Sequence, residues 1–310
     1  MNKNILILGH TGFLGKNLTK FLQEKKPKNL YKISKEDCDL RDYNKICSFL
    51  KTIPKIDIIF NCAANVGSVH YVTKYAGDVI HDNSLITINI YKAILEFFPN
   101  ATIVNPFSNC CYVDGKDIQK EENWLKGEVH PSVFSFGNFK RFLYYTSKCY
   151  NIQHGIKSLN LMFSGIYGPG DSTDPNKVHA LNGMIIRMLE SIKNNDNEFE
   201  IWGTGKPIRE WTYIEDTCNV MVESLSLKKE IIEPLNIAQG TGFSIAETAK
   251  CISNSIGYKG KLVFNTEYQD GAAVKILGNE NFKKIFKEYT FFNHQKGIDE
   301  TVKYYKSITT

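Results

Sequence analysis

The sequence lacks the features that mark several classes of protein. None of its apolar runs approaches the length of about 20 residues that a membrane-spanning helix needs, so we expect no membrane contact. The first residues lead directly into an apolar run without the pattern of a signal peptide, and we therefore expect a cytoplasmic protein. The net charge is only +5 and the lysines are dispersed, so nucleic acid is not an expected partner.

The sequence also lacks a pattern of metal ligands or of structural disulfides. Its eight cysteines include no C-x-x-C pair, and the seven histidines are not spaced with them as zinc ligands. We therefore expect no metal site, and in a cytoplasmic protein we expect free thiols. A chain of 310 residues without repeats or low-complexity linkers predicts one large domain or two unequal ones.

The most informative stretch comes at the start, where a short apolar run ends at a glycine. Ile5–Leu8 has no polar position, which is typical of a strand buried on both faces of a parallel sheet. Helical spacing of apolar residues then begins at Phe13. A strand, a glycine turn and a helix in this order are typical of a dinucleotide site, although an ordinary glycine-rich turn is the alternative. The predicted cofactor contacts here are Gly9, Thr11, Gly12, Phe13, Leu14 and Gly15.

The second predicted strand, Leu30–Ser34, favours NADPH or NADP over NAD. Folds that bind NAD usually place an acidic residue at the end of this strand, for the ribose 2′-hydroxyl. Here the strand ends at Ser34-Lys35, and the first acid, Glu36, comes slightly late. A hydroxyl and a cation tolerate a 2′-phosphate, although Lys35 could also be a solvated turn residue.

Small residues follow the third predicted strand, Ile56–Asn61. At the carboxyl end of a strand, small side chains allow a cofactor to lie against the backbone. The further predicted cofactor contacts are Asp39, Leu40, Ala63 and Ala64.

The rest of the chain predicts an α/β protein with a Rossmann doubly wound parallel sheet and a smaller C-terminal α+β substrate domain. A helical pattern over 79–98 is apolar on more than one face, as in a helix that is deeply buried or shared between two subunits. Residues 1–165 and 207–240 are assigned to the NADP-binding domain, and 166–206 and 241–310 to the nucleotide-sugar-binding domain. Further strands are predicted at 101–105, 159–164, 199–202, 234–238 and 261–264, and helices around 184–192, 244–256 and 297–305.

Several motifs along the chain resemble those of the extended short-chain dehydrogenase/reductases, and among these the GDP-L-fucose synthases. They are Gly9-x-x-Gly12-x-x-Gly15, Ser108–Tyr112, Tyr167–Pro169, Trp202–Asp216 and Asp270-Gly271. The resemblance covers essentially the whole chain. It implies a homodimeric, NADPH-dependent enzyme that acts on a GDP-linked 4-keto sugar.

The family pairs a serine or threonine with a Tyr-x-x-x-Lys motif, and two lysines compete for the catalytic position. Tyr144-x-x-x-Lys148 matches the motif literally, whereas Phe136-x-x-x-Lys140 does not. From Lys140 there is room for about four helical turns before His154-Gly155, as the family requires, and from Lys148 for less than two. Spacing therefore favours Lys140 as the catalytic lysine, with Ser108 as its hydroxyl partner.

Phe136 then occupies the position of the general acid, where the family has tyrosine. Phenylalanine has the ring but no proton to give, so a loss of activity on the order of 10²–10⁴ is expected. A deliberate change that traps a bound substrate and a natural loss of activity both fit. The isosteric ring, together with the other site residues, favours the first.

Further site residues follow from the resemblance. Cys110 and His179 correspond to the pair that epimerises C3 and C5 in the family, a thiolate and an imidazole acting next to the 4-keto group. Cys110 could instead be a small buried residue, and His179 a polar group near the site. Arg187, Trp202 and Arg209 correspond to the nucleotide-sugar contacts, although Trp202 and Arg209 could simply pack the small domain.

The chain departs from the family at three places. Ser164-Gly165 replaces a Thr-Asn pair beside the substrate, Gly278 replaces an Asp, and Thr11 stands where an Arg often meets the cofactor phosphate. These changes leave open which sugar is bound, a 6-deoxyhexose or a heptose of a surface polysaccharide.

The sequence therefore predicts an NADPH-dependent C4-reductase of a GDP-linked 4-keto sugar. The alternatives are the bifunctional 3,5-epimerase/4-reductase and a non-catalytic NADP(H)-binding protein, in which Phe136 would be the natural residue. A dehydratase is disfavoured because Asn109–Cys111 lacks the Asp-Glu pair typical of that class.

Overall fold

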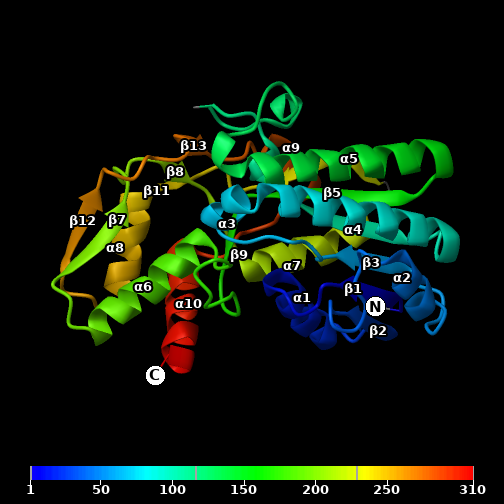
Figure 1. Ribbon diagram of the computed structural model, residues 1–310, viewed down its shortest axis with the longest axis horizontal. Helices are drawn as coiled ribbons and strands as arrows, with labels where there is room; N and C mark the ends of the chain where they lie inside the picture. Colours follow the sequence, from blue (N-terminus) through cyan, green and yellow to red (C-terminus); the bar gives the residue numbers. More distant parts are fainter. Residues whose placement is uncertain (1, 116, 228–229, 310) are drawn as a thin grey trace.

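The computed structural model describes residues 2–115, 117–227 and 230–309, and within them six parallel strands form a central sheet (Figure 1). The spatial order is β10-β5-β4-β3-β1-β2, so the chain starts in the sheet interior and winds outward in both directions. This order confirms the predicted doubly wound fold and places a switch point between β1 and β3. The strands are β1 Asn4–Leu8, β2 Asn29–Ile33, β3 Ile58–Asn61, β4 Thr102–Ser108, β5 Lys157–Phe163 and β10 Ile231–Ile237.

Helices cover both faces of this sheet. Side chains alternate along β1, so Ile5 and Ile7 pack into one hydrophobic cluster, and Leu6 and Leu8 into another. The first cluster includes side chains of α1 and α7, and the second includes side chains of α2, α4 and α5. Burial on both faces explains the uninterrupted apolar character of this strand. The helices are α1 Phe13–Glu24, α2 Tyr43–Leu50, α3 Val69–Lys74, α4 Ala76–Phe97, α5 Phe134–His154 and α7 Ile214–Glu223.

A ladder of buried asparagines crosses three central strands. Asn61 Nδ2 donates to Asn105 Oδ1 at 3.0 Å, and Asn105 Nδ2 donates to Asn160 Oδ1 at 2.9 Å. The Asn105 side chain also donates to the Tyr91 hydroxyl at 2.9 Å. Because a buried amide without partners is costly, the ladder favours the one strand register that satisfies it.

Most of the remaining elements gather beyond the carboxyl ends of the central strands, on the left in Figure 1, whereas α9 packs against β10. They form short sheets, with the pairings β11-β8-β13, β12-β7 and β6-β9, and the helices α6, α8, α9 and α10. The strands are β6 Gly165–Tyr167, β7 Glu198–Trp202, β8 Ile208–Arg209, β9 Trp211–Tyr213, β11 Phe243–Ser244, β12 Lys261–Asn265 and β13 Val274–Lys275. The helices are α6 Ala180–Lys193, α8 Ile245–Ile256, α9 Glu280–Ile285 and α10 His294–Thr309.

The predicted elements are confirmed to within a few residues, including the return of the chain to the main sheet at β10. The domain limits themselves stay a prediction. In the described part of the chain, the helices fall short of the length and apolar character needed to cross a membrane.

Candidate active site

The glycine turn brings β1, α1 and the end of β3 close together. Gly9 has a positive φ of 76°, and a Cβ there would lie 2.8 Å from Ala63 Cα. A Cβ on Gly15 would lie 2.1 Å from Gly9 O, so only glycine allows α1 to pack this closely. Gly12 is the N-cap of α1 and has no side chain to occupy the amides of the first turn. These amides can therefore receive a phosphate.

The end of β2 carries an acidic residue that sequence reasoning missed. Asp37 Oδ2 accepts hydrogen bonds from the Ser34 amide at 2.9 Å and from Ser34 Oγ at 2.7 Å, and lies 3.8 Å from His10 Nε2. The hydrogen bonds from Ser34 lower the pKa of Asp37. Lys35 is exposed beside it, so a cation and a carboxylate both flank the expected adenosine ribose.

The other predicted cofactor residues lie near the same sheet edge. Arg41 holds the Asp39 carboxylate through Nε at 3.0 Å and Nη2 at 2.7 Å, which lowers the pKa of Asp39 to about 2. Leu40 is buried next to it. Ala63 and Ala64 directly follow β3 and are half-buried. The Asp39 carboxylate is therefore already engaged in an ion pair within the protein.

Ser108 ends β4, with its hydroxyl oriented by the next turn. Its Oγ accepts a hydrogen bond from the Cys110 amide at 3.3 Å, which leaves the hydroxyl proton available for donation. A carbonyl oxygen that gains charge beside Ser108 would be stabilised by this proton.

Helix α5 carries Phe136 and Lys140, and Lys140 contacts strand β4. Lys140 Nζ donates to Pro106 O of β4 at 2.7 Å and lies 5.4 Å from the centre of the Phe136 ring. Burial lowers the pKa of Lys140 to about 8, even though nearby thiols oppose this shift. Phe136 is 9% exposed and has no hydroxyl, so no acidic group is available at this position.

The literal Tyr-x-x-x-Lys motif lies elsewhere on α5. The Tyr144 hydroxyl donates to Glu233 Oε1 at 2.7 Å, and Lys148 Nζ donates to the Tyr144 hydroxyl and to Glu233 Oε1, both at 2.8 Å. Glu233 belongs to the first half of β10, away from the carboxyl ends of the strands. The motif therefore forms an ion-pair network, and its location supports the choice of Lys140.

His179 is held by a buried carboxylate. It is the N-cap of α6, and its Nδ1 lies 3.0 Å from Asp171 Oδ2. Asp171 Oδ2 also accepts from Asn182 Nδ2 at 2.9 Å. Burial alone would raise the pKa of Asp171, but the bonds from His179 and Asn182 outweigh it and lower the pKa. The His179 ring lies 5.5 Å from that of Phe13, at the start of α1.

Arg187 and Trp202 form part of an aromatic cluster. The Arg187 guanidinium lies 4.6 Å from the Trp202 ring centre and 5.0 Å from that of Phe199. Trp202 also stacks on Tyr268, with ring centres 5.0 Å apart. Both stacked rings are about half exposed, and a nucleoside base could contact them.

Arg209 lies on the short strand β8, opposite Lys275 of β13. Burial lowers the pKa of Arg209. The next residue, Glu210, ties these strands to the end of β10, because its carboxylate accepts from the amides of Gln239 and Leu277. Burial raises the pKa of Glu210 to about 7.

Comparison with known proteins identifies the family of this chain. A sequence model described as "NAD dependent epimerase/dehydratase family" matches residues 5–238. The chain belongs to this family. The predicted resemblance to the extended short-chain dehydrogenase/reductases is confirmed.

Individual members of the epimerase/dehydratase family are similar over nearly the whole chain. A GDP-L-fucose synthase of Dictyostelium discoideum is 29% identical over 98% of this chain and 95% of its own. A GDP-6-OMe-4-keto-L-xylo-heptose reductase from C. jejuni has a TM-score of 0.88 at 24% identity, with 99% and 98% coverage. A GDP-L-fucose synthetase of Naegleria fowleri bound to NADP has a TM-score of 0.89 at 22% identity, with 99% and 93% coverage.

The residues that depart from the family pattern contact other residues inside this protein. Ser164 Oγ lies 2.7 Å from Thr212 Oγ1 in the interior, so this hydroxyl is used within the protein. Gly165 lies against the Trp211 ring, where a Cβ would come within 2.8 Å. A Cβ on Gly278 would approach Glu280 Oε2 at 2.9 Å. A larger residue at 165 or 278 would therefore require its neighbours to move.

Four residues of interest were missed by sequence reasoning: Asp37, Asp171, Tyr268 and Lys275. Tyr268 and Lys275 meet their partners only in the folded chain, whereas Asp37 and Asp171 contact residues that are near in the sequence. A weak signal existed for Asp171, an acid eight residues before His179 and directly after the Gly168–Gly170 break.

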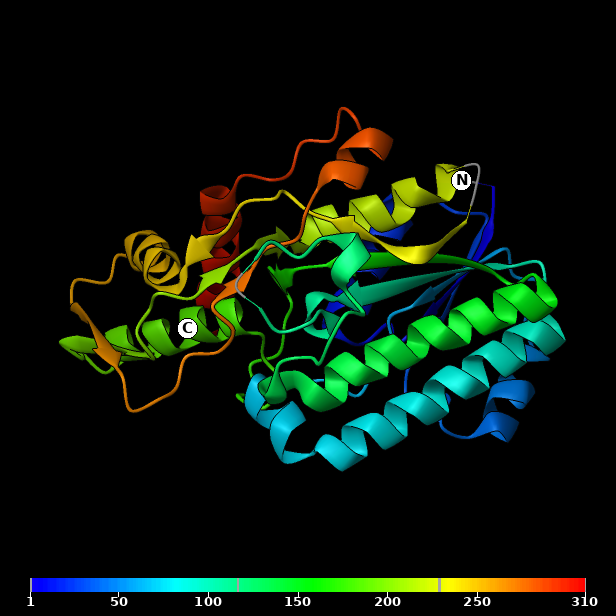
Figure 2. The ribbon, with the colours of Figure 1, turned by 90° about the horizontal axis from the view of Figure 1, so that it is seen from above.

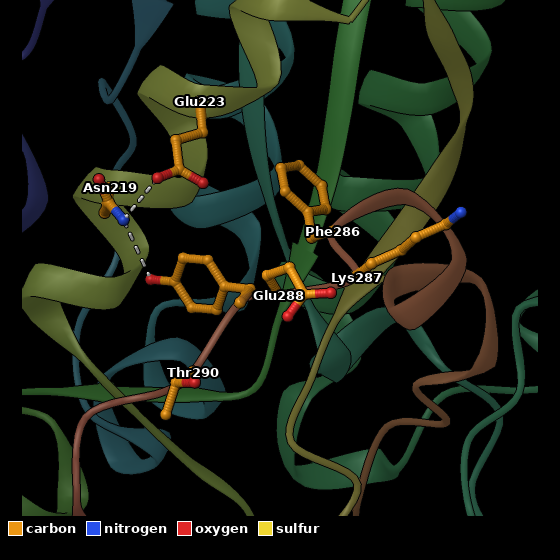
Figure 3. A pocket seen from close by; sticks show the side chains of 7 residues that line it. Asn219, Glu223, Phe286, Lys287, Glu288 and Thr290 are labelled. Carbon is orange, nitrogen blue, oxygen red and sulfur yellow. Dashed lines mark hydrogen bonds between the residues drawn. The ribbon is translucent and has the colours of Figure 1, made fainter.

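A surface pocket elsewhere does not contribute to this site (Figure 3). It lies between α7 and the segment after α9, and Asn219 Nδ2 bridges Glu223 and the Tyr289 hydroxyl beside it. None of the predicted site residues is among the residues that line it. All eight cysteines are free, as expected, and the described residues contain no cluster of three or more potential metal ligands.

Proposed function

We propose that this chain is a cytoplasmic, NADPH-dependent C4-reductase of a GDP-linked 4-keto sugar, a 6-deoxyhexose or heptose used for surface polysaccharide. The observation that carries the proposal is the hydrogen bond from Lys140 to Pro106 of β4, two residues before Ser108, with the Phe136 ring 5.4 Å from the same ammonium. A bound NADPH would supply the hydride for C4. The Ser108 hydroxyl supports the carbonyl oxygen as its charge develops.

The cofactor would lie across the carboxyl edge of the sheet. The first-turn amides of α1 would receive its pyrophosphate, and Ser34 and Lys35 its 2′-phosphate. The Lys140 ammonium would turn from Pro106 O to the nicotinamide ribose. The NADP-bound relative from Naegleria fowleri supports NADP over NAD, whereas Asp37 near the ribose opposes it.

The GDP moiety would lie on the small domain. Arginines bind a diphosphate through paired hydrogen bonds, and we assign this role to Arg187 and Arg209. The guanine would contact Trp202, and the stack with Tyr268 extends this surface. The printed names of the relatives, GDP-sugar synthases and a GDP-heptose reductase, support this substrate class.

Phe136 makes the chain an active-site Tyr-to-Phe form with impaired turnover. The Phe136→Tyr variant places a phenol beside the Lys140 ammonium, which favours proton transfer to the substrate oxygen. We expect its turnover, measured as NADPH oxidation with a GDP-4-keto-6-deoxyhexose and a GDP-4-keto-heptose, to rise on the order of 10²–10⁴-fold.

The matched control replaces Tyr144, the tyrosine of the literal Tyr-x-x-x-Lys motif on α5. Tyr144→Phe in the Phe136→Tyr background should leave turnover unchanged, because Tyr144 bonds Glu233. If Phe136→Tyr brings no gain with either sugar, the reductase proposal is wrong.

Cys110 and His179 support a second candidate, the bifunctional epimerase/reductase. His179 has the buried carboxylate partner that an acid–base histidine needs. In D₂O, deuterium should enter the sugar at C3 and C5, and Cys110→Ser should abolish this incorporation. If the parent chain incorporates no deuterium into the sugar, the epimerase/reductase candidate is rejected and the C4-reductase proposal remains.

Phe136 itself favours a third candidate, a non-catalytic NADP(H)-binding protein. Calorimetric titration separates it from the enzymes. Binding of NADP without any binding of GDP would support it, and binding of both would count against it.

A further inference from the structure

The aromatic surface proposed for the base carries a carboxylate that takes no part in the reduction. Glu200 lies on β7, two residues before Trp202, so both side chains leave the same face of the strand. The neighbouring strand β12 pairs with β7 in parallel register and sets Asn265 opposite Trp202 (Figure 1). Glu200, Trp202 and Asn265 therefore share one face of this two-stranded sheet.

Both oxygens of the Glu200 carboxylate are held by side-chain donors. Oε1 accepts a hydrogen bond from Trp202 Nε1 at 2.9 Å, and Oε2 accepts one from Asn265 Nδ2 at 2.9 Å. Asn265 is held in turn, because its Oδ1 accepts from the Glu267 amide at 3.0 Å. Each carboxylate oxygen has acceptor capacity for about two hydrogen bonds, and Glu200 is exposed. The carboxylate therefore presents a fixed pair of parallel acceptors to a ligand.

This pair of acceptors lies at the edge of a surface on which a planar ring can stack. Trp202 stacks on Tyr268 with ring planes 22° apart, and both rings are about half exposed. The Arg187 guanidinium lies 4.6 Å from the Trp202 ring centre and interacts electrostatically with Glu200. A base that stacks on an exposed ring here can bring its edge to the carboxylate.

Guanine is the base whose edge suits two parallel acceptors. Its N1–H and its 2-amino group are adjacent donors, which can bind both oxygens of one carboxylate, as a guanidinium does. Adenine presents its 6-amino donor next to the N1 acceptor, and uracil presents N3–H between two carbonyl oxygens. The lone pairs of these acceptors would face the carboxylate and repel it. The site thus favours guanine by attraction and rejects the other bases by repulsion.

We infer that Glu200 is the residue that distinguishes guanine from other bases, through paired hydrogen bonds from N1–H and the 2-amino group. Trp202 and Asn265 also hold the carboxylate in place for this contact. The inference rests on the proposed function for the presence of a nucleoside diphosphate, and it adds the group that recognises the base.

Calorimetric titration of the full chain with GDP, inosine diphosphate, ADP and UDP tests the inference. The parent chain should bind GDP best and inosine diphosphate about tenfold more weakly, because inosine lacks the 2-amino donor. In Glu200→Gln the side chain has one acceptor and one donor, so GDP affinity should fall about tenfold to a hundredfold. ADP affinity should rise, because an amide pairs with the 6-amino group and N1 of adenine.

Glu198→Gln is the matched control. Glu198 is exposed on the same face of β7, and its replacement removes the same charge two residues further from Trp202. This variant should keep the preference for GDP, and NADP affinity should be unchanged in both variants.

Three results would overturn the inference while leaving a GDP-binding chain in place. They are a parent chain without preference for GDP, an unchanged ratio of GDP to ADP affinity in Glu200→Gln, and an equal loss of affinity for all four diphosphates in that variant. A parent chain that binds NADP and none of the four diphosphates would overturn both this inference and the proposed function.

Discussion

At the scale of the residue, Lys140 is a buried ammonium with one carbonyl partner. Its pKa falls from an ordinary value of about 10.5 to about 8 because burial penalises the charged form. Between these two values the unfolded chain binds more protons than the folded chain. The contribution of Lys140 to the free energy of unfolding therefore rises as the pH increases from about 8 to 10.5.

Replacing this lysine should remove its contribution to the pH dependence of stability. We expect Lys140→Met to be more stable than the parent near pH 7, by up to about 3 kcal/mol, and this advantage to shrink above pH 8. Urea unfolding at several pH values measures it. Lys148→Met is the control, because Lys148 is an exposed ion-pair partner with a raised pKa and should show no such trend in this window. A pH-independent difference for Lys140→Met would contradict the prediction.

Motif and spacing were enough to predict that Phe136 and Lys140 lie together on one helix near the end of the strand that carries Ser108. The helix and the strand that carry them each have a clear local pattern, and the lysine lies at a fixed helical distance from position 136. Lys275 could not be found in this way. Its partner, Cys110, is 165 positions away in the chain, and only the folded small domain brings the two together.

At the scale of the element, strands with a clear pattern were predictable and very short strands were not. β1 and β10 have buried apolar residues and fixed neighbours in the sheet. β8 and β13 have two residues each, too few for any periodicity, and they pair across a long stretch of chain. The positions of Arg209 and Lys275 depend on these two strands.

The glycine turn gives a test of how α1 packs. In Gly15→Ala the new Cβ would meet backbone atoms of Gly9 and His10, at 2.1 and 2.8 Å, so the helix must shift. We expect a loss of stability of about 1–3 kcal/mol and at least a tenfold loss of NADP affinity. Thermal unfolding and calorimetry measure the two effects.

Gly12→Ala is the matched control for Gly15→Ala. The nearest atom, Gly9 O, would be 3.5 Å from the new Cβ, which is an ordinary contact. Stability should therefore hold while NADP affinity falls, because the methyl group would lie where the pyrophosphate approaches. Full stability and full affinity in Gly15→Ala would contradict this account of the turn.

At the scale of the whole molecule, α4 and α5 lie side by side along one face, as Figure 2 shows. Apolar side chains are exposed there, with Ile88 at 45%, Tyr145 at 52% and Ile152 at 75%. Large exposed apolar side chains on one face are typical of an interface between subunits. We therefore predict a homodimer that pairs through these two helices.

Light scattering at micromolar concentration tests this prediction. The parent chain should have the mass of a dimer, and the double variant Tyr145→Asp and Ile152→Asp the mass of a monomer, because buried unpaired carboxylates oppose association. Ile285→Asp, on the exposed end of α9, should remain dimeric. A monomeric parent chain would refute the prediction.

The late return of the chain at β10 affects how the protein is made on the ribosome. β5 is complete at Phe163 and has β4 on one side, but its other neighbour, β10, starts only at Ile231, after the first segment of the small domain. At about 5–20 residues per second, the nascent β5 waits roughly 3 to 14 s with an open backbone edge. An apolar strand with an open edge is a template for pairing with other chains. Translation of this stretch is therefore the period in which a ribosome-bound chaperone would protect the protein most.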